Sequence, residues 1–544
     1  MASVPNGNGH SASMPDKQEP MAIIGMATRF PQEATNTEKL WEFLLKGRSA
    51  HTAFSEWQPV FPKKLPTQSS CGDRINPDGH YHPDPEHGGT FAVKGGHFLS
   101  EDPAYFDAPF FGITKTEVLS LDPQQRVIME NVYQALENAG LPITKVTGTN
   151  TSVYVSGFNH DHLATLNSDP ETTLKYKPTG TTNSLLSNRV SWFFDFKAPS
   201  LTLDTACSSS MVALHLACQS LRCGESEMSV VSGVTMISFP TDITSMGHHG
   251  FLSQEGRCFS FDHRADGYAR GEGVGTVIVK RLSDALRDGD TIRAVIRGTG
   301  VNQDGRTAGI SLPSSAAQES LMRTVYASAG LDFNDTMMVE AHGTGTAAGD
   351  PIEASAIART FASRSKDIPL FVGAIKSGIG HLEGGAGIAG IIKSVLVLES
   401  GIIPPNVNFE KANPKIPVEK WNLQFPLVNT PWPTPGLRRI SVNSFGVGGT
   451  NGHTVLDDAY NYLTSRNLTG AHNTNHNTPT AEQIRDTAAK VDGAIALDAE
   501  MDALANGHSN GTSNGETTNG ATANGETTNG ETTNGETTNG ETTN

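Results

Sequence analysis

The sequence predicts an α/β protein, and three observations support this fold class. Short apolar runs typical of buried strands recur along the chain, at residues 21–25, 152–155, 228–233, 275–279 and 292–296. Helical patterns lie between some of these runs, at residues 123–140, 210–221 and 315–329. Strands that alternate with helices build layered sheets and helices, because each element buries its apolar face against another.

The composition excludes several classes of protein. Of the 544 residues, 36% are apolar or aromatic (AVILMFWYC) and 18% are charged, which is ordinary for a globular protein and unlike a collagen-like or wholly disordered chain. The 40 Lys and Arg residues against 57 Asp and Glu residues give a net charge of −17. Nucleic acids and anionic membranes bind basic patches, so neither is an expected partner.

The cysteines and the chain's start indicate a cytoplasmic location. The chain has 5 cysteines and no Cys-x-x-Cys pair, which fits a reducing compartment and argues against a zinc site, so we expect no bound metal. Residues 1–18 are polar and lack the apolar core of a signal peptide. The run at 388–398 carries a lysine and falls short of the roughly 18 residues that a membrane span needs.

Three regions differ in composition. Residues 1–18 are expected to be disordered, and residues 19–459 are dense in apolar runs. Residues 460–544 form a polar tail that ends in an imperfect Asn-Gly-Glu-Thr-Thr repeat, which cannot bury enough apolar surface to offset ordering entropy. A capping-box pattern at Thr480-x-x-Gln483 predicts a helix over 480–505. That helix is either a marginal solvated one or a docking helix for a partner.

Cys207 is a candidate nucleophile. Residues 201–210 are typical of a strand that runs into a turn and then a helix, with Cys207 at the turn. There the helix dipole and free N–H groups favour a thiolate, and the same N–H groups could hold a carbonyl oxygen as it becomes an oxyanion. The alternative is a buried structural cysteine, the common role of a single cysteine.

Two histidines are candidate partners for this cysteine. His342 and His381 each lie in a glycine-rich loop just after an apolar run, where α/β proteins place functional groups. Thr344 and Thr346 add small hydroxyl groups beside His342. A cysteine with two such histidines can form an acyl thioester and stabilise an enolate. Either histidine alone could equally be a solvated or hydrogen-bonded side chain.

Three motifs in this chain resemble those of β-ketoacyl synthases in order and spacing. They are Asp204-Thr-Ala-Cys207-Ser-Ser, Glu340-Ala-His342-Gly-Thr-Gly-Thr and Lys376-Ser-Gly-Ile-Gly-His381. The resemblance runs from about residue 20 to 459 and is to the ketosynthase domain of fungal type I polyketide synthases. Supporting stretches lie at residues 25–31, 122–126, 187–191, 267–273, 300–305 and 443–450.

The resemblance implies a thiolase fold, with two similar halves (about 19–270 and 271–459) stacked as five layers, α-β-α-β-α. It also implies a homodimer. Cys207 would accept the acyl chain, and His342 and His381 would assist decarboxylation of a malonyl-type extender. Lys376 would help to order His381. No cofactor is implied, because the substrates arrive on the phosphopantetheine of a carrier protein.

The resemblance assigns roles to three further residues. Thr344 and Thr346 would hold the pantetheine arm. The backbone N–H groups of Cys207 and Val447 would form the oxyanion hole.

Departures from the family pattern give further expectations. Val447 stands where the family has Phe or Tyr, so the gate to the acyl pocket should be wider. Gly378 replaces an Asn, so the loop carrying His381 should be looser, and Gly452 replaces an Ala without an evident consequence. Before the polar tail, the sequence contains no Gly-x-Ser-x-Gly pattern of an acyltransferase elbow, and the whole sequence contains no Asp-Ser-Leu pantetheine site. We therefore expect a free-standing ketosynthase that acts on chains carried by a separate polyketide synthase.

Three functions stay open from the sequence. The first is a trans-acting condensing enzyme that performs acyl transfer to Cys207 and then decarboxylative Claisen condensation. The second is an acyl-processing enzyme that offloads or transfers a polyketide chain without extension. The third, of another class, is a non-catalytic scaffold or chain-length partner subunit. Release of carbon dioxide from an extender distinguishes the first from the second, and an intact nucleophile argues against the third.

Overall fold

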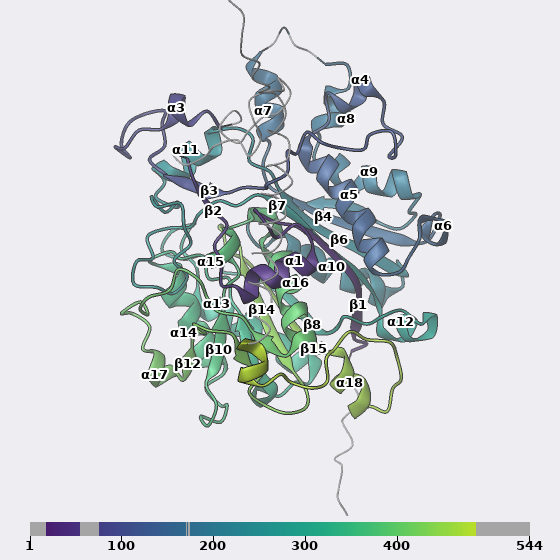
Figure 1. Cartoon of the computed structure of the whole chain (residues 1–544), viewed down its shortest axis with the longest axis vertical. Helices are drawn as coiled ribbons and strands as arrows, with labels where there is room; N and C mark the ends of the chain where they lie inside the picture. The colour runs from purple at the N-terminus through teal and green to yellow at the C-terminus, as the bar shows by residue number, and fades with distance from the viewer. Residues whose placement is uncertain (1–17, 55–74, 170, 172–173, 486–544) are drawn as a thin grey trace, which may run out of the picture. The chain divides into compact units, whose positions relative to one another are not determined.

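One mixed eleven-stranded sheet organises the part of the chain that the computed structural model describes, residues 18–54, 75–169, 171 and 174–485 (Figure 1). These residues belong to the first of two units, residues 1–488. In order across the sheet, the strands are β12 (Leu423–Gln424), β10 (Leu370–Gly373), β9 (Thr336–Glu340), β14 (Arg439–Phe445), β15 (Thr450–Asp458), β8 (Ala294–Gln303), β1 (Met21–Arg29), β7 (Gly273–Arg281), β6 (Met228–Thr235), β4 (Thr151–Gly157) and β5 (Ser200–Leu203).

The sheet consists of two halves with the same pairing pattern. In one half β5, β4 and β6 are parallel, while β7 and β1 follow antiparallel. In the other, β10, β9 and β14 are parallel, while β15 and β8 follow antiparallel. β1 meets β8 only through residues 21–23, which pair with residues 294–296. The two halves are thus joined along a short stretch.

Two buried helices lie between the halves. Both α10 (Ser209–Cys223) and α16 (Ala386–Ser400) contact strands of each half. α16 buries 14 of its 15 residues, including the apolar run at 388–398, because a helix that is apolar on all sides is stable only inside a protein. Among the described residues, no helix is both long and apolar enough to cross a membrane.

Further helices cover the outer faces and complete the five layers. α5 (Pro123–Asn138) and α9 (Ser184–Phe194) pack on strands of the first half. α13 (Ser315–Ala329) packs on β8 and β15, and α14 (Gly349–Thr360) packs on α13. The predicted layering α-β-α-β-α is therefore present, with α10 and α16 as its middle layer.

Shorter elements connect this framework. They are α1 (Thr37–Leu45), β2 (His51–Ala53), α3 (Pro77–His80), β3 (Gly95–His97), α4 (Lys115–Val118), α6 (Ile143–Val146), α7 (Asp161–Ser168), α8 (Lys177–Thr181), α11 (Thr241–His248), α12 (Leu282–Asp288), η1 (Phe333–Asp335), α15 (Lys376–Ile379), η2 (Glu383–Gly385), β11 (Ile402–Ile403), α17 (Val418–Trp421), β13 (Thr430–Pro431) and α18 (Ala459–Ser465).

The boundary between the halves differs from the expected one. β7 follows residue 270, yet it pairs with β6 and β1 of the first half. Its backbone pairs with both of those strands, so the first half continues through Arg281. A boundary near 270 is therefore too early.

The C-terminal boundary at 459 is also too early. α18 contacts β8 and β15 and buries Tyr462 and Leu463. The capping box is present: the Thr480 N–H donates to Gln483 Oε1 (2.9 Å), and the Gln483 N–H donates to Thr480 Oγ1 (3.2 Å). Ile484 then packs with Leu45 in a small apolar cluster. Residues 460–485 are thus part of the folded body, and the rest of the helix expected at 480–505 lies outside the described residues.

Candidate active site

The chain turns sharply at the candidate nucleophile. β5 ends at Leu203, α10 begins at Ser209, and Cys207 lies between them. Ala206 takes a φ of +55°, a conformation that costs a non-glycine residue about 1–3 kcal/mol. Side chains on both sides hold this turn, because Asp204 Oδ1 accepts from the Ala206 N–H (2.8 Å) and Ser209 Oγ accepts from the Thr205 N–H (2.7 Å).

A carboxylate holds His342 at the end of β9. Glu353 of α14 accepts hydrogen bonds from the His342 N–H and the Gly343 N–H, both at 2.8 Å. The imidazole Nδ1 of His342 accepts from the Phe445 N–H (3.3 Å). With Nδ1 occupied by a donor, the proton of the neutral ring resides on Nε2.

His381 is held in the same way, in a fully buried position. Its backbone pairs with the segment before β7, through the His381 N–H to the Ala269 carbonyl (2.7 Å) and the Gly271 N–H to the His381 carbonyl (2.8 Å). Its Nδ1 accepts from the Glu383 N–H (2.9 Å). Its Nε2 has no hydrogen-bond partner within the described part of the chain, so it is available to a substrate.

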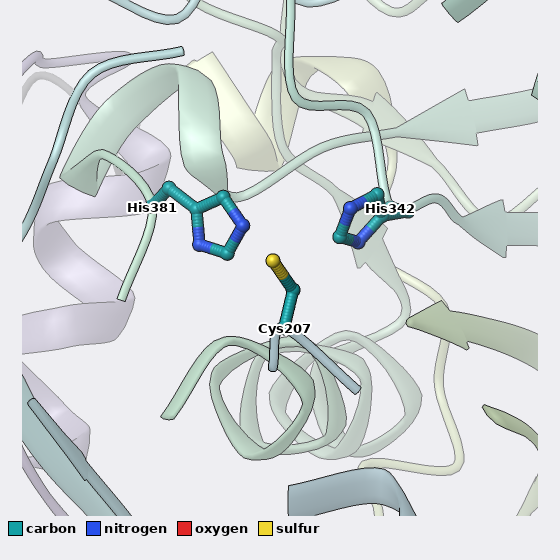
Figure 2. Close-up of side chains that lie close together, drawn as sticks. All are labelled: Cys207, His342 and His381. Carbon is teal, nitrogen blue, oxygen red and sulfur yellow. The ribbon is translucent and has the colours of Figure 1, made fainter. Parts of the chain in front are cut away.

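The structure brings the three candidate residues together, as Figure 2 shows. One nitrogen of each histidine and the Cys207 sulfur lie within 4.8 Å of one another. The two imidazole rings are nearly perpendicular, at 84°, with centroids 5.6 Å apart. Burial and then the nearby Lys376 charge lower the pKa of both histidines well below the usual 6.5. Both rings are therefore neutral Nε2–H donors at neutral pH.

This arrangement suits hydrogen bonding to an oxygen better than metal binding. A cysteine and two histidines this close could form a site for a soft divalent cation. A metal on Nε2, however, needs the ring proton on Nδ1, where a second-shell acceptor normally receives it. Here backbone N–H donors occupy both Nδ1 positions. The histidines are held as donors rather than as ligands.

At Cys207, burial affects the pKa of the thiol more than the neighbouring N–H groups do. Burial raises the pKa of the Cys207 thiol to about 12, although the N–H groups of Val447 and of Cys207 itself, together with the Lys376 charge, act to lower it. The expected thiolate is thus replaced by a neutral thiol in the resting site. The N–H groups of Val447 and Cys207 thus lie beside the sulfur.

Lys376 is a buried residue of α15 whose charge acts on both histidines. Burial lowers the pKa of its ammonium group, while the carboxylates of Glu353 and Glu340 raise it. Glu340 also forms a buried ion pair with Lys393 at 2.7 Å. The Lys376 charge lowers the pKa of both histidines, as a residue that supports the site would.

The two threonines and Val447 lie at the cavity above Cys207. The hydroxyl oxygens of Thr344 and Thr346 are 3.3 Å apart. Val447 is 52% exposed, so its side chain borders the opening rather than filling it. Gly448 and Gly449 follow with φ of +91° and +92°, and these left-handed conformations let the loop turn back after Val447.

The two glycine departures have different structural settings. Gly378 is firmly held, because its carbonyl accepts from the Ala50 N–H (2.8 Å) and its own N–H donates to the Ile375 carbonyl (2.9 Å). These bonds argue against the looser loop expected there. Gly452 faces Met211 of α10, and a Cβ on it would lie 2.5 Å from Met211 Cγ. Gly452 thus leaves room for Met211 in the middle layer.

Four residues of the site were missed from the sequence. Asp350 and Glu353, one helical turn apart in α14, bind backbone N–H groups of the His342 loop. Tyr268 lies against His381 with ring centroids 4.9 Å apart, and Glu383 lines the same cavity. A signal existed for the first pair, since two carboxylates three residues apart begin four residues after the Gly-Thr-Gly-Thr stretch.

A cavity of about 360 Å³ opens above the three residues. Most of its wall is apolar. The apolar lining includes Phe158, Met246, Phe251, Ile310, Leu312 and Phe445. The cavity therefore suits an acyl chain that enters toward the Cys207 thiol.

Three family models match the chain in succession. They are the β-ketoacyl synthase N-terminal domain at residues 18–285, its C-terminal domain at 293–410 and the ketoacyl-synthetase C-terminal extension at 412–517. Among solved structures, the oxazolomycin ketosynthase domain of Streptomyces albus matches with a TM-score of 0.73 and 34% identity, covering 81% of this chain and 75% of that one. A ketosynthase from the bacillaene synthase of Bacillus subtilis matches with a TM-score of 0.72 and 33% identity, covering 81% and 72%.

The curated relatives are fungal polyketide synthases. The highly reducing polyketide synthase tazB of Aspergillus terreus is 52% identical over 493 residues, which are 89% of this chain and 17% of that protein. The 6-hydroxymellein synthase cdmE of Talaromyces verruculosus is 48% identical over 85% of this chain and 17% of that protein. The chain thus spans about a fifth or less of the length of these relatives, which give no support to a free-standing enzyme.

Together the fold, the cavity and these matches define a condensing enzyme of the acyltransferase type. The chain belongs to the β-ketoacyl synthase family, as its three motifs predicted. The predicted thiolase-like α/β fold is confirmed by the same structural matches.

Proposed function

We propose that this chain condenses carrier-bound polyketide acyl chains with a malonyl-type extender by means of Cys207, His342 and His381. The observation that carries the proposal is the pair of neutral Nε2–H donors beside a buried thiol at the floor of an apolar cavity. Two such donors suit one oxygen that becomes negative during the reaction.

The first half-reaction loads the enzyme. The Cys207 sulfur attacks the thioester carbonyl of an incoming acyl chain, and the N–H groups of Cys207 and Val447 receive the oxyanion. The carbon–sulfur bond to pantetheine then breaks, and the thiol proton of Cys207 leaves with the pantetheine sulfur. Because this proton is handed from one sulfur to the other, both histidines keep their protonation state.

The second half-reaction forms the carbon–carbon bond. The extender's thioester oxygen lies between the Nε2–H groups of His342 and His381, which stabilise the enolate as carbon dioxide leaves. The enolate carbon attacks the Cys207 thioester, and the bond to the Cys207 sulfur breaks to release a β-ketoacyl product. Thr344 and Thr346 hold the pantetheine arm, and Lys376 maintains the field that keeps both rings neutral.

The carrier is a phosphopantetheine-bearing domain, as the polyketide synthase relatives suggest. The relatives are much longer than this chain, so the carrier domain can belong to the same polypeptide or to another protein. A carrier supplied as a separate protein therefore tests whether the chain acts in trans. We also propose a homodimer in the cytoplasm. Among the described residues β5 is the last strand of the sheet, and a partner could pair with its outer edge.

Intact mass tests the assignment of the nucleophile. Protein incubated with acyl-pantetheine thioesters should gain the mass of one acyl group, and Cys207→Ala should gain none. Cys218→Ala is the matched control, because Cys218 is a buried cysteine of α10 that does not line the cavity. Malonyl-carrier protein should then release carbon dioxide from the acylated enzyme. An acylated enzyme that releases none would leave transfer without extension as the function.

A further inference from the structure

Each condensation consumes one proton inside the cavity. When the enolate displaces Cys207, the sulfur departs as a thiolate, and loading of the next chain uses the proton of a restored thiol. Burial raises the pKa of that thiol to about 12, so the thiolate is a strong base that needs a donor within reach. This argument rests on the proposed condensation.

The residues already assigned are poor sources of this proton. The two histidines are neutral, with their single ring protons engaged in holding the enolate oxygen. Lys376 is not among the residues that line the cavity, and no other lysine or arginine of the described chain lines it either. The donor must therefore be a group of a different kind.

Glu383 is the candidate donor. It lines the cavity with Cys207 and the histidines, yet its side chain is only 1% exposed. Its Oε1 has no hydrogen-bond partner within the described residues. The backbone at Glu383 takes a φ of +42°, and its N–H is the group that binds His381 Nδ1. A non-glycine residue in this strained conformation is typical of a functional site.

Burial keeps the Glu383 carboxyl group able to hold a proton, although a cation faces it. Arg270, on the segment before β7, has its Nε 3.6 Å from Glu383 Oε1. Asp242 of α11 lies 3.9 Å from the same guanidinium, and Asp161 of α7 also acts on it. Tyr268 faces the carboxyl group from the His381 side. Burial, opposed by Arg270 and aided by Asp242, raises the pKa of Glu383 to about 7.

We propose that Glu383 donates the proton that converts the Cys207 thiolate back to the thiol after each condensation. The Glu383 O–H bond breaks as the Cys207 S–H bond forms, and the carboxylate regains a proton from solvent before the next cycle. The thiol proton that leaves with pantetheine during loading balances the one that Glu383 supplies.

Burst kinetics of Glu383→Gln test this role. The variant should acylate Cys207 and release the first equivalent of carbon dioxide at wild-type rates, because the proton is needed only afterwards. Later turnovers should slow by about a hundredfold, within the usual range for loss of general acid catalysis. Normal acylation also shows that the variant is folded.

The pH dependence of steady-state turnover gives a second readout. The donor must be protonated, so wild-type turnover should fall as pH rises through about 7, and Glu383→Gln should lack this decline. Asp242→Asn is the matched control, because it removes a negative neighbour and thus lowers the pKa of Glu383. It should keep the maximal rate and move the decline to lower pH.

Three results would overturn the proposal or its basis, and each leads to a different conclusion. A Glu383→Gln variant with the wild-type burst and pH profile would assign the proton to another group, such as Lys376. A variant that fails to acylate Cys207 would show that the Glu383 carboxyl group acts before condensation and not after it. A wild-type enzyme that acylates Cys207 but releases no carbon dioxide would refute the proposed function instead.

Discussion

Single residues in this site are positioned by backbone contacts rather than by side-chain bulk. Both histidines are oriented by N–H groups, from Glu383 and Phe445. Ala206, before the nucleophile, carries a left-handed φ of +55°. Such strain persists only where surrounding structure enforces it. Chemistry at the site therefore depends on loops whose shapes are set by their neighbours.

Val447 provides a test of the gate at the residue scale. Val447→Phe adds a ring at the cavity opening while keeping the backbone N–H in place. We expect acylation of Cys207 by acetyl-pantetheine to stay within about twofold, and acylation by octanoyl-pantetheine to slow about tenfold, as pocket size effects of 1–3 kcal/mol allow. Rates from intact mass measure this. Equal slowing of both substrates would instead place the change in the oxyanion hole.

The observed helices match the predicted ones closely where caps and periodicity lie within a short stretch of sequence. The pattern at 315–329 matches α13 residue for residue, and 210–221 lies within α10 at 209–223. The helix expected at 123–140 ends two residues earlier, at Asn138. Asp122 and Pro123 mark its start, since Asp122 Oδ1 accepts from the Gln124 N–H (2.8 Å). Caps and periodicity lie within one turn, so sequence alone reveals them.

The C-terminal segment gives a prediction at the element scale. Ile484 is 3% exposed and packs with Leu45, Ile402 and Trp41. Ile484→Ala should lower the free energy of unfolding by about 2–4 kcal/mol through lost burial and the cavity left behind. Urea unfolding measures this, with the half-exposed Leu468→Ala as the control that should cost far less. An unchanged value would mean that this segment does not stabilise the body.

At the scale of the whole molecule, the proposed homodimer concerns the edge of the sheet at β5, which is the last strand among the described residues. On β5 and the neighbouring α9, Leu201 is 46% exposed and Trp192 is 69% exposed. Exposed apolar side chains beside an unpaired edge strand are typical of an interface. An edge paired with a second copy would extend the sheet across the dimer.

Light scattering during size-exclusion chromatography tests this interface. The wild-type chain should have the mass of a dimer, and Leu201→Lys should have that of a monomer, because a buried unpaired charge is costly. Leu427→Lys, a similar change at a leucine that is 57% exposed away from β5, should remain dimeric. A dimeric Leu201→Lys variant would place the contact elsewhere.

The motifs reveal the fold class, the enzyme family and the candidate residues Cys207, His342 and His381, because residue type and spacing carry that chemistry. Contacts between segments distant in the sequence supply the rest. Glu383 and Arg270 are more than a hundred residues apart, yet they face each other beside His381. Burial reverses the thiolate expected at Cys207, and the Asn443 amide reaches Glu353 across the second half. Folding decides which side chains are desolvated and which residues form hydrogen bonds and ion pairs with them. The spacing of residues along the chain does not predict these contacts.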